Sequence, residues 1–199
     1  MRKLLIYIFV CAFIFISAFS QNPFEIAKIK IDLGKFSSQY KSYTTEFYTA
    51  SKKKIGKYLC FDLIDIIDKN IKQLSVTERK KLVIIPETST GESIATTYND
   101  YDINNRKITP MLIVGVIKGT VGDTAVIEDF GGANSKLKIK SVDNEIQKAV
   151  ERRVYLQMKN ISDEDRDKIF INRSLIFPED QNTSRWMTDL VDLKLYLLK

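Results

Sequence analysis

Short runs of apolar residues, each closed by a residue that breaks regular structure, most constrain the fold of this 199-residue chain. Residues 82–85 form a continuous apolar run before Pro86, and residues 111–117 form another shortly before Gly119. Runs of this length are typical of buried strands, because a helix of the same apolar character would be longer. Residues 173–177 predict a further strand of this kind. The chain is therefore predicted to place several strands in its core.

Alternating polar and apolar residues predict the remaining strands, and two segments show helical spacing instead. Apolar residues recur three and four apart in residues 61–68 and four apart in residues 142–158, so each segment predicts a helix. No repeat and no Pro/Gly/Ser linker divides the chain. We therefore expect one α+β domain over residues 21–199, with mixed β-sheets, short helices and a long connection at about 119–170. The other expected strands are 24–33, 43–50, 93–98 in a hairpin with 82–86, 121–127 and 187–198.

The first 20 residues have the composition of a secretory signal peptide. Arg2 and Lys3 precede an uncharged apolar run, and Ala18-Phe19-Ser20 is a small-x-small cleavage site. We predict cleavage before Gln21, a secreted or periplasmic protein, and no stable membrane span after cleavage. A membrane anchor is the alternative, but the run of 16 residues is shorter than the roughly 20 that span a bilayer. A lipoprotein is less favoured, because bulky residues precede Cys11.

The composition excludes several kinds of chemistry. The chain contains no histidine, which excludes Ser-His-Asp and Cys-His catalysis and histidine-ligated metal sites within it. Cleavage would leave Cys60 as the one cysteine, which excludes a thiolate zinc site and an intramolecular disulfide. The formal charge of +6 would fall to +4 without Arg2 and Lys3, and the basic residues are scattered. We therefore expect no nucleic-acid partner.

Three segments carry a family resemblance. Residues 58–64 predict a strand that leads into a short helix, and residues 82–101 predict a strand, a turn, a second strand and an acidic helix start. Residues 173–180 are followed by Arg185-Trp186 and a closing strand. In this order the segments resemble the molybdopterin-binding domain of the sulfite oxidase family, over roughly residues 24–118 and 171–198.

The resemblance implies a sulfite oxidase-like fold and names molybdopterin as the alternative to having no cofactor. Enzymes of that family hold molybdenum through a cysteine thiolate and surround the pterin with histidine and arginine. This chain has no histidine, and Cys60 falls where the family motif has no metal ligand. Between Leu59 and Phe61, Cys60 is expected to be a small buried hydrophobe. The resemblance thus implies the fold while the departures argue against redox activity.

Arg173, Arg185 and Trp186 are the candidate cofactor- or ligand-binding residues. Guanidinium groups bind phosphate or carboxylate as a fork, and an indole ring stacks on planar ligands. The alternatives are a core-edge position for Trp186, a surface ion pair for Arg185 and a solvated strand end for Arg173. No catalytic residue and no metal ligand is predicted.

Acidic clusters give weaker candidates. Residues 163–167 and 100–104 have the opening spacing of a calcium loop, but neither has the glutamate that closes one. Glu87 and Glu92, with acids of the second cluster, could supply a carboxylate pair for glycoside hydrolysis, but carboxylates are common on any surface. We therefore expect these acids to be solvated.

Three functions remain open at this point. The first is an exported, non-catalytic domain of molybdopterin-oxidoreductase-like fold that binds a small ligand or an envelope protein. The second is a molybdopterin-dependent oxidoreductase or its subunit, with Arg173, Arg185 and lysine residues holding the pterin phosphate. The third is a structural or interaction protein of the cell envelope.

Overall fold

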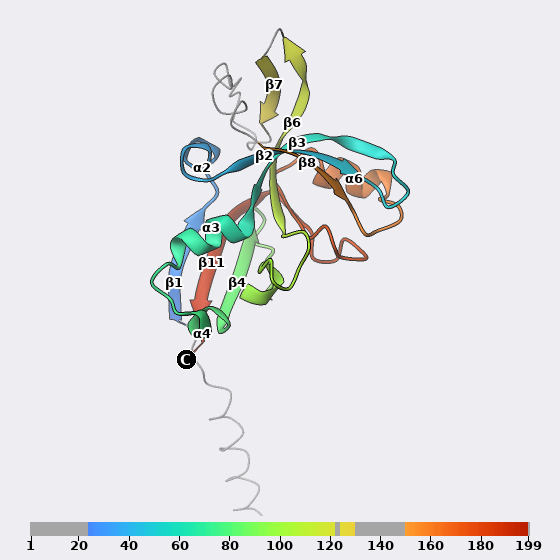
Figure 1. Cartoon of the computed structure of the whole chain (residues 1–199). Helices are drawn as coiled ribbons and strands as arrows, with labels where there is room; N and C mark the ends of the chain where they lie inside the picture. Colours follow the sequence, from blue (N-terminus) through green and yellow to red (C-terminus); the bar gives the residue numbers. More distant parts are fainter. Residues whose placement is uncertain (1–23, 122–123, 130–149, 199) are drawn as a thin grey trace, which may run out of the picture.

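The computed structural model of the chain describes residues 24–121, 124–129 and 150–198, so the predicted signal peptide lies outside the described residues (Figure 1). Within these ranges the chain has the expected α+β class, with two sheets and short helices. The elements in chain order are β1 (Phe24–Lys30), α2 (Leu33–Gln39), β2 (Ser42–Tyr48), β3 (Lys54–Asp62), α3 (Leu63–Asn70), α4 (Val76–Arg79), β4 (Leu82–Thr88), β5 (Thr96–Thr97), η1 (Tyr98–Asp100), β6 (Met111–Val121), β7 (Thr124–Asp129), β8 (Val150–Tyr155), α6 (Asp163–Ile169), β9 (Ser174–Ile176), β10 (Met187–Thr188) and β11 (Leu190–Leu197).

The described strands form two sheets. Sheet A has the order β1-β11-β4-β5 and is antiparallel throughout. Sheet B has the order β10-β9-β6-β3-β2-β8, with β7 paired to the outer part of β6. Sheet B is mixed, because β8 runs parallel to β2 while its other pairs are antiparallel.

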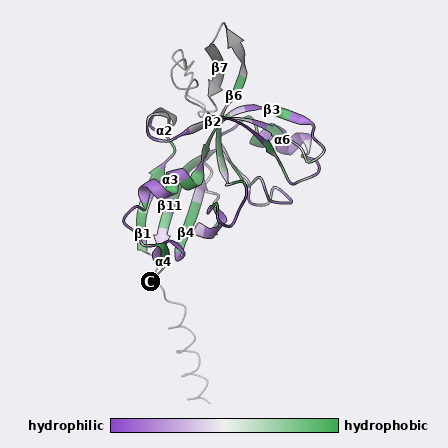
Figure 2. Ribbon diagram, viewed as in Figure 1, coloured by the Kyte–Doolittle hydropathy of each residue, from purple (hydrophilic) through white to green (hydrophobic). Residues whose placement is uncertain are grey.

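The runs expected to be buried strands are confirmed as the core of both sheets. Leu82 and Ile84 of β4 and Leu112 of β6 are essentially inaccessible to solvent, as is Leu175 of β9. β4 pairs with β5 in the expected hairpin, whose turn includes Gly91 at φ 84°, a conformation that favours glycine. Figure 2 shows hydrophobic residues along β1 and β4 and mostly hydrophilic ones on α6.

The helix expected over residues 61–68 is α3, which begins at Leu63 because Phe61 and Asp62 still belong to β3. Its apolar stripe of Leu63, Ile66 and Ile67 is buried in the core. In Figure 1 the helix runs across sheet A. Within the described ranges, no helix is long and apolar enough to cross a membrane.

The helix expected over residues 142–158 is wrong in its described part, because residues 150–155 form the strand β8. Val150 and Val154 lie four apart, and that spacing places two side chains on one face of a strand as well as on one face of a helix. Pairing with β2 decides between them, since it gives the backbone of β8 a parallel ladder. Residues 142–149 lie outside the described residues.

Several expected strands also have other bounds. The strand expected over 93–98 is β5 at Thr96–Thr97, and the strand expected over 121–127 is β7 at Thr124–Asp129. The strand expected over 187–198 is divided at Asp189, whose φ of 55° turns the chain, so that β10 joins sheet B and β11 joins sheet A. The strand expected over 24–33 ends at Lys30, and a short helix begins at Leu33. The last part of the chain therefore ties the two sheets together.

Candidate functional site

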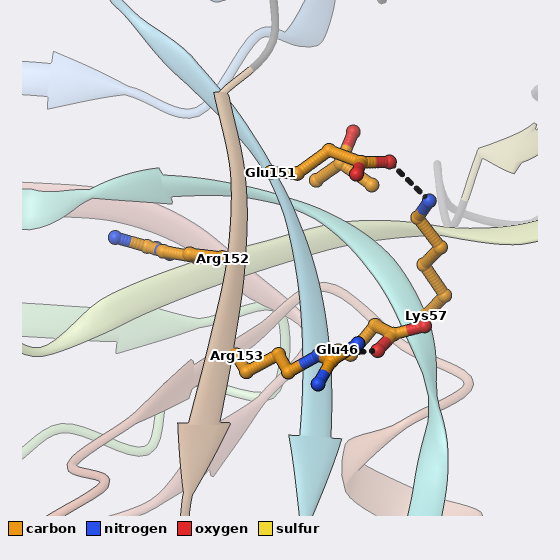
Figure 3. A pocket seen from close by; sticks show the side chains of 6 residues that line it. Glu46, Lys57, Glu151, Arg152 and Arg153 are labelled. Atoms are coloured by element: carbon orange, nitrogen blue, oxygen red, sulfur yellow. Dashed lines mark hydrogen bonds and ion pairs between the residues drawn. The ribbon is translucent and has the colours of Figure 1, made fainter.

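Three strands of sheet B carry a polar cavity of about 320 Å³ (Figure 3). Its size lies at the lower end of the range typical of small-molecule sites. Its walls come from the consecutive strands β2 and β3 and from β8, which is distant from them in sequence. The lining residues are Thr44, Glu46, Lys57, Glu151, Arg152 and Arg153.

Strand register brings these charges onto one face of the sheet. The antiparallel β2–β3 pair places Glu46 opposite Lys57, and the parallel β2–β8 pair places Glu46 opposite Arg153. In the adjacent row, Thr44 lies opposite Glu151. Because every second residue of a strand points to the same face, these side chains project together. The result is a row of alternating charge across three strands: lysine, glutamate, arginine.

The other face of the same strands is aromatic and packed. The ring of Tyr58 lies 5.9 Å from that of Phe47 and 5.1 Å from that of Phe170, measured between centroids. Gly56 makes this packing feasible, because a Cβ at that position would lie 2.6 Å from the Tyr58 hydroxyl oxygen. The polar cavity therefore rests on strands that are held by the core on their other side.

Lys57 and Glu151 form an ion pair in the wall of the cavity. The Lys57 Nζ lies 2.6 Å from a Glu151 carboxylate oxygen, as the dashed line in Figure 3 marks. The Glu151 side chain is 77% exposed. A pair that is this open to water contributes little net stability, so a ligand can replace either partner at small cost.

Glu46 is the more enclosed carboxylate and has several donors. Lys54 Nζ lies 2.7 Å from one oxygen, and the Tyr48 hydroxyl donates to the other at 2.8 Å. The Arg153 Nε lies 3.4 Å from that second oxygen. Hydrogen bonds from Lys54 and then Tyr48 lower the pKa of Glu46 below its usual value, so its negative charge persists at neutral pH.

Arg152 differs from its neighbours because its side chain extends to the other side of β8 (Figure 3). Its guanidinium donates to Asp62 at 2.7 Å and to the Thr45 hydroxyl at 2.8 Å, and it lies 4.0 Å from the centroid of the Tyr43 ring. Arg152 thus fastens β8 to β2 and β3 rather than facing the cavity with its charge.

Cys60 lies on β3 and is fully buried, as expected. Burial raises the pKa of its thiol to about 12, so the thiolate does not form at neutral pH. The Arg152 charge and a hydrogen bond with Thr45 lower that pKa by less than burial raises it. The Cys60 thiol is therefore neither a nucleophile nor an accessible metal ligand in this fold.

The structure places the predicted candidate Arg185 in a network of carboxylates. Its Nη1 lies 2.7 Å from Asp100, its Nη2 lies 2.6 Å from Asp180, and its Nε donates to the second Asp180 oxygen at 2.8 Å. The guanidinium carbon also lies 4.3 Å from the centroid of the Phe177 ring. The hydrogen bond with Asp180 is the largest cause of a raised Arg185 pKa. Arg185 thus binds two side chains of its own fold.

The two other predicted residues also contact the protein's own backbone. Trp186 is buried, and its indole N–H donates to the Phe177 carbonyl at 3.1 Å. Arg173 donates to the Ile31 carbonyl, just beyond the end of β1, at 3.3 Å. The structure thus brings Arg185 and Trp186 together around Phe177, while Arg173 contacts a different element.

Most of the acidic candidates contact other parts of the protein. Residues 163–167 lie in α6, where Ser162 caps the first turn by accepting from the Asp165 N–H. Glu87 pairs with Lys194, and Asp100 pairs with Arg185. In the described part of the chain, no group of three carboxylates or cysteines is placed to hold a metal ion.

No sequence motif marks the four charged residues of the cavity, which are Glu46, Lys57, Glu151 and Arg153. The sequence does contain a signal for Glu46, because Glu46 is the one acid among the Ser, Thr, Tyr and Phe residues of the strand at 42–48. Glu151 and Arg153 were assigned to a helix, which hid the fact that they share a strand face. Lys57 joins them only through pairing register, which no local pattern reveals.

Comparison of the chain with models of known protein families gave no match. Searches among curated proteins and among solved structures gave none either. The resemblance to the sulfite oxidase family therefore stays a prediction, and the function is inferred from the chemistry of the described residues.

Proposed function

We propose that this chain is an exported, non-catalytic binding protein whose β2–β3–β8 cavity takes a small zwitterion, such as a free amino acid or a short peptide. The single observation that carries this proposal is the alternation of charge across the cavity, from Lys57 through Glu46 to Arg153, with Glu151 beside them. Export is supported by the basic start, apolar run and cleavage site of residues 1–20.

A zwitterion suits this cavity better than an ion of one sign. An anion that approaches Lys57 or Arg153 meets the carboxylates of Glu46 and Glu151 within the same cavity. A molecule with both charges can place its carboxylate against the basic side chains and its ammonium group against Glu151. Each new contact then replaces part of an exposed ion pair, and none leaves a buried charge without a partner.

The cysteine and the candidate residues on which molybdopterin binding would depend do not fit that cofactor. The Cys60 thiol is buried with its pKa raised to about 12, so it offers no thiolate to molybdenum. The donors of Arg185 are engaged by Asp100 and Asp180, and the Trp186 indole is buried. A binding role is therefore proposed in place of molybdenum chemistry, and a fold of the sulfite oxidase type stays a prediction.

The test compares three forms of one dipeptide on the purified protein: dialanine free at both ends, N-acetylated dialanine and dialanine amide. Binding is measured by calorimetry and by the shifts of backbone amide signals in NMR spectra. We expect the free dipeptide to shift the amides of β2, β3 and β8, and each blocked form to bind about ten-fold more weakly or worse.

Lys57→Ala should weaken the binding of free dialanine about ten-fold, because it removes a charge-assisted contact to the carboxylate. Lys194→Ala is the matched control, since Lys194 forms a comparable ion pair with Glu87 in sheet A at 2.7 Å. Equal binding of all three dipeptide forms, or equal effects of the two lysine variants, would refute the zwitterion site.

A further inference from the structure

Among the described residues, β8 forms one edge of sheet B and is unpaired on its outer side over most of its length. Among the described strands it pairs with β2 on one side and with none on the other. The Leu156 N–H, just past β8, donates to the Tyr48 carbonyl on β2. Backbone groups alternate in direction along a strand, so those of Glu151, Arg153 and Tyr155 point away from β2.

The open stretch has a defined end. The Gln157 N–H points the same way as that of Tyr155, and it donates to the Pro178 carbonyl at 3.0 Å. Residues 151–155 therefore present backbone donors and acceptors at the sheet edge, and the chain covers the edge again immediately afterwards. Proteins protect such edges with proline, with bulges or with charged side chains. β8 carries charged side chains, but Glu151 and Arg153 are of opposite sign and lie on one face, so two copies of this edge can meet with opposite charges facing each other.

We propose that the edge of β8 pairs antiparallel with β8 of a second copy of this chain, about a two-fold axis at Arg152. In this register Glu151 lies opposite the partner subunit's Arg153, and Arg153 lies opposite the partner subunit's Glu151. Both are hydrogen-bonded positions, because the backbone groups of these residues point outward. The contact forms two cross-strand ion pairs and continues sheet B from one subunit into the next.

Charge selects this register over its neighbours. Moving the axis to Glu151 would place the two copies of Glu151 opposite each other, and moving it to Arg153 would do the same with the two copies of Arg153. Like charges in directly opposite positions are destabilising. The axis at Arg152 is the one among these three that satisfies both the outward backbone groups and the side-chain charges.

The proposed pairing extends a row that already exists. Lys57 lies opposite Glu46, and Glu46 lies opposite Arg153. The next position along this row would be the partner subunit's Glu151, so the alternation of sign continues across the axis. The Arg153 side chain is 70% exposed, which leaves it accessible to such a partner.

The residue on the axis does not oppose this arrangement. Two arginines meet there, but each Arg152 side chain turns back into its own subunit and pairs with Asp62 at 2.7 Å. Tyr43 covers the guanidinium, and Thr45 accepts from its Nε. The charge of each Arg152 is thus balanced within its own subunit before the two strands approach.

The test measures the oligomeric state by sedimentation velocity, without added ligand, from about 1 µM to about 500 µM, the range that suits a small interface. We expect a reversible monomer–dimer equilibrium for the wild-type chain. Glu151→Arg and Arg153→Glu each replace two opposite-charge pairs with two like-charge pairs, so each alone should dimerise at least about ten-fold more weakly.

An equimolar mixture of Glu151→Arg and Arg153→Glu chains should regain the dimer, because each position then faces the opposite charge. Lys194→Glu, on sheet A, is the control and should dimerise like the wild type; circular dichroism establishes that each variant is folded. A wild-type chain that stays monomeric at the highest concentration, or a mixture that does not recover, overturns the proposal. Dipeptide binding is read separately, so the zwitterion site stands or falls on its own.

Discussion

Two groups of side chains in this molecule both combine basic and acidic residues but differ in how enclosed their charges are. One is the Arg185 cluster, defined as Arg185, Arg106, Asp100 and Asp180 against Phe177; the other is the β2–β3–β8 cavity. In the Arg185 cluster the guanidinium groups are largely enclosed, and each contacts two carboxylates. In the cavity the outer ion pairs are open to water. The difference teaches that a basic residue is available to a ligand only where its present partner can be exchanged.

The largest expected difference in stability between the two groups concerns Arg185. Arg185→Ala should lower the free energy of unfolding by about 2 to 3 kcal/mol, because it leaves two partly buried carboxylates without their closest cation. Urea denaturation measures the loss. Arg153→Ala is the matched cavity variant and should change stability by less than about 0.5 kcal/mol. Equal losses from the two variants would contradict the distinction.

The dependence of stability on pH tests the Arg185 cluster in a second way. Burial raises the pKa of Asp100, but hydrogen bonds from the Thr97 backbone and from Arg185 outweigh it, so the net pKa is lowered. The stability that the Asp100 carboxylate contributes is therefore present at neutral pH. It is lost as the pH falls below the usual pKa of an aspartate and through the lowered pKa of Asp100 in the folded state. Arg185→Ala should lose less stability over that acid range than the wild type.

Replacing Cys60 should lower stability by less than Arg185→Ala and by more than Lys57→Ala. Cys60→Ala should lower stability by about 1 kcal/mol, because the buried thiol acts as a small hydrophobe whose removal leaves a small void. Urea denaturation measures the stability of this variant, and calorimetry measures its binding of free dialanine. Loss of dipeptide binding in a variant that remains folded would show that the thiol takes part in the site.

Lys57 should have the smallest effect on stability. Lys57→Ala removes one exposed ion pair, so the free energy of unfolding should change by less than about 0.5 kcal/mol. This sharpens the comparison, since the same variant is expected to weaken dipeptide binding while the fold is unaffected. A loss of stability as large as that of Arg185→Ala would make Lys57 a structural residue.

Much of the fold could be predicted because the responsible signals are local. The apolar run 82–85, the spacing of 61–68 and the turn at Gly91 each depend on neighbouring residues, and the structure confirms the strand, helix and hairpin. The division at Asp189 could not be predicted in this way, because apolar alternation continues past it. A positive φ at a non-glycine residue depends on the two sheets that the chain must join.

The candidate site was less accessible to sequence reasoning, for a physical reason. Its charges come from β2, β3 and β8, and they meet only once the register of two strand pairs is known. The helical interpretation of residues 150–155 also removed two of the four charges from any strand face. Conversely, Arg185 and Trp186 stand out in the sequence as an unusual pair. In the structure Arg185 pairs with Asp100, which is distant in sequence, and the Trp186 indole donates to the carbonyl of Phe177.

The position of β11 has a consequence for folding during synthesis. β11 lies between β1 and β4, although it is made after both. Until residues 190–197 leave the ribosome, sheet A lacks the strand that joins β1 to β4. Sheet A can therefore close only after almost the whole chain has been made.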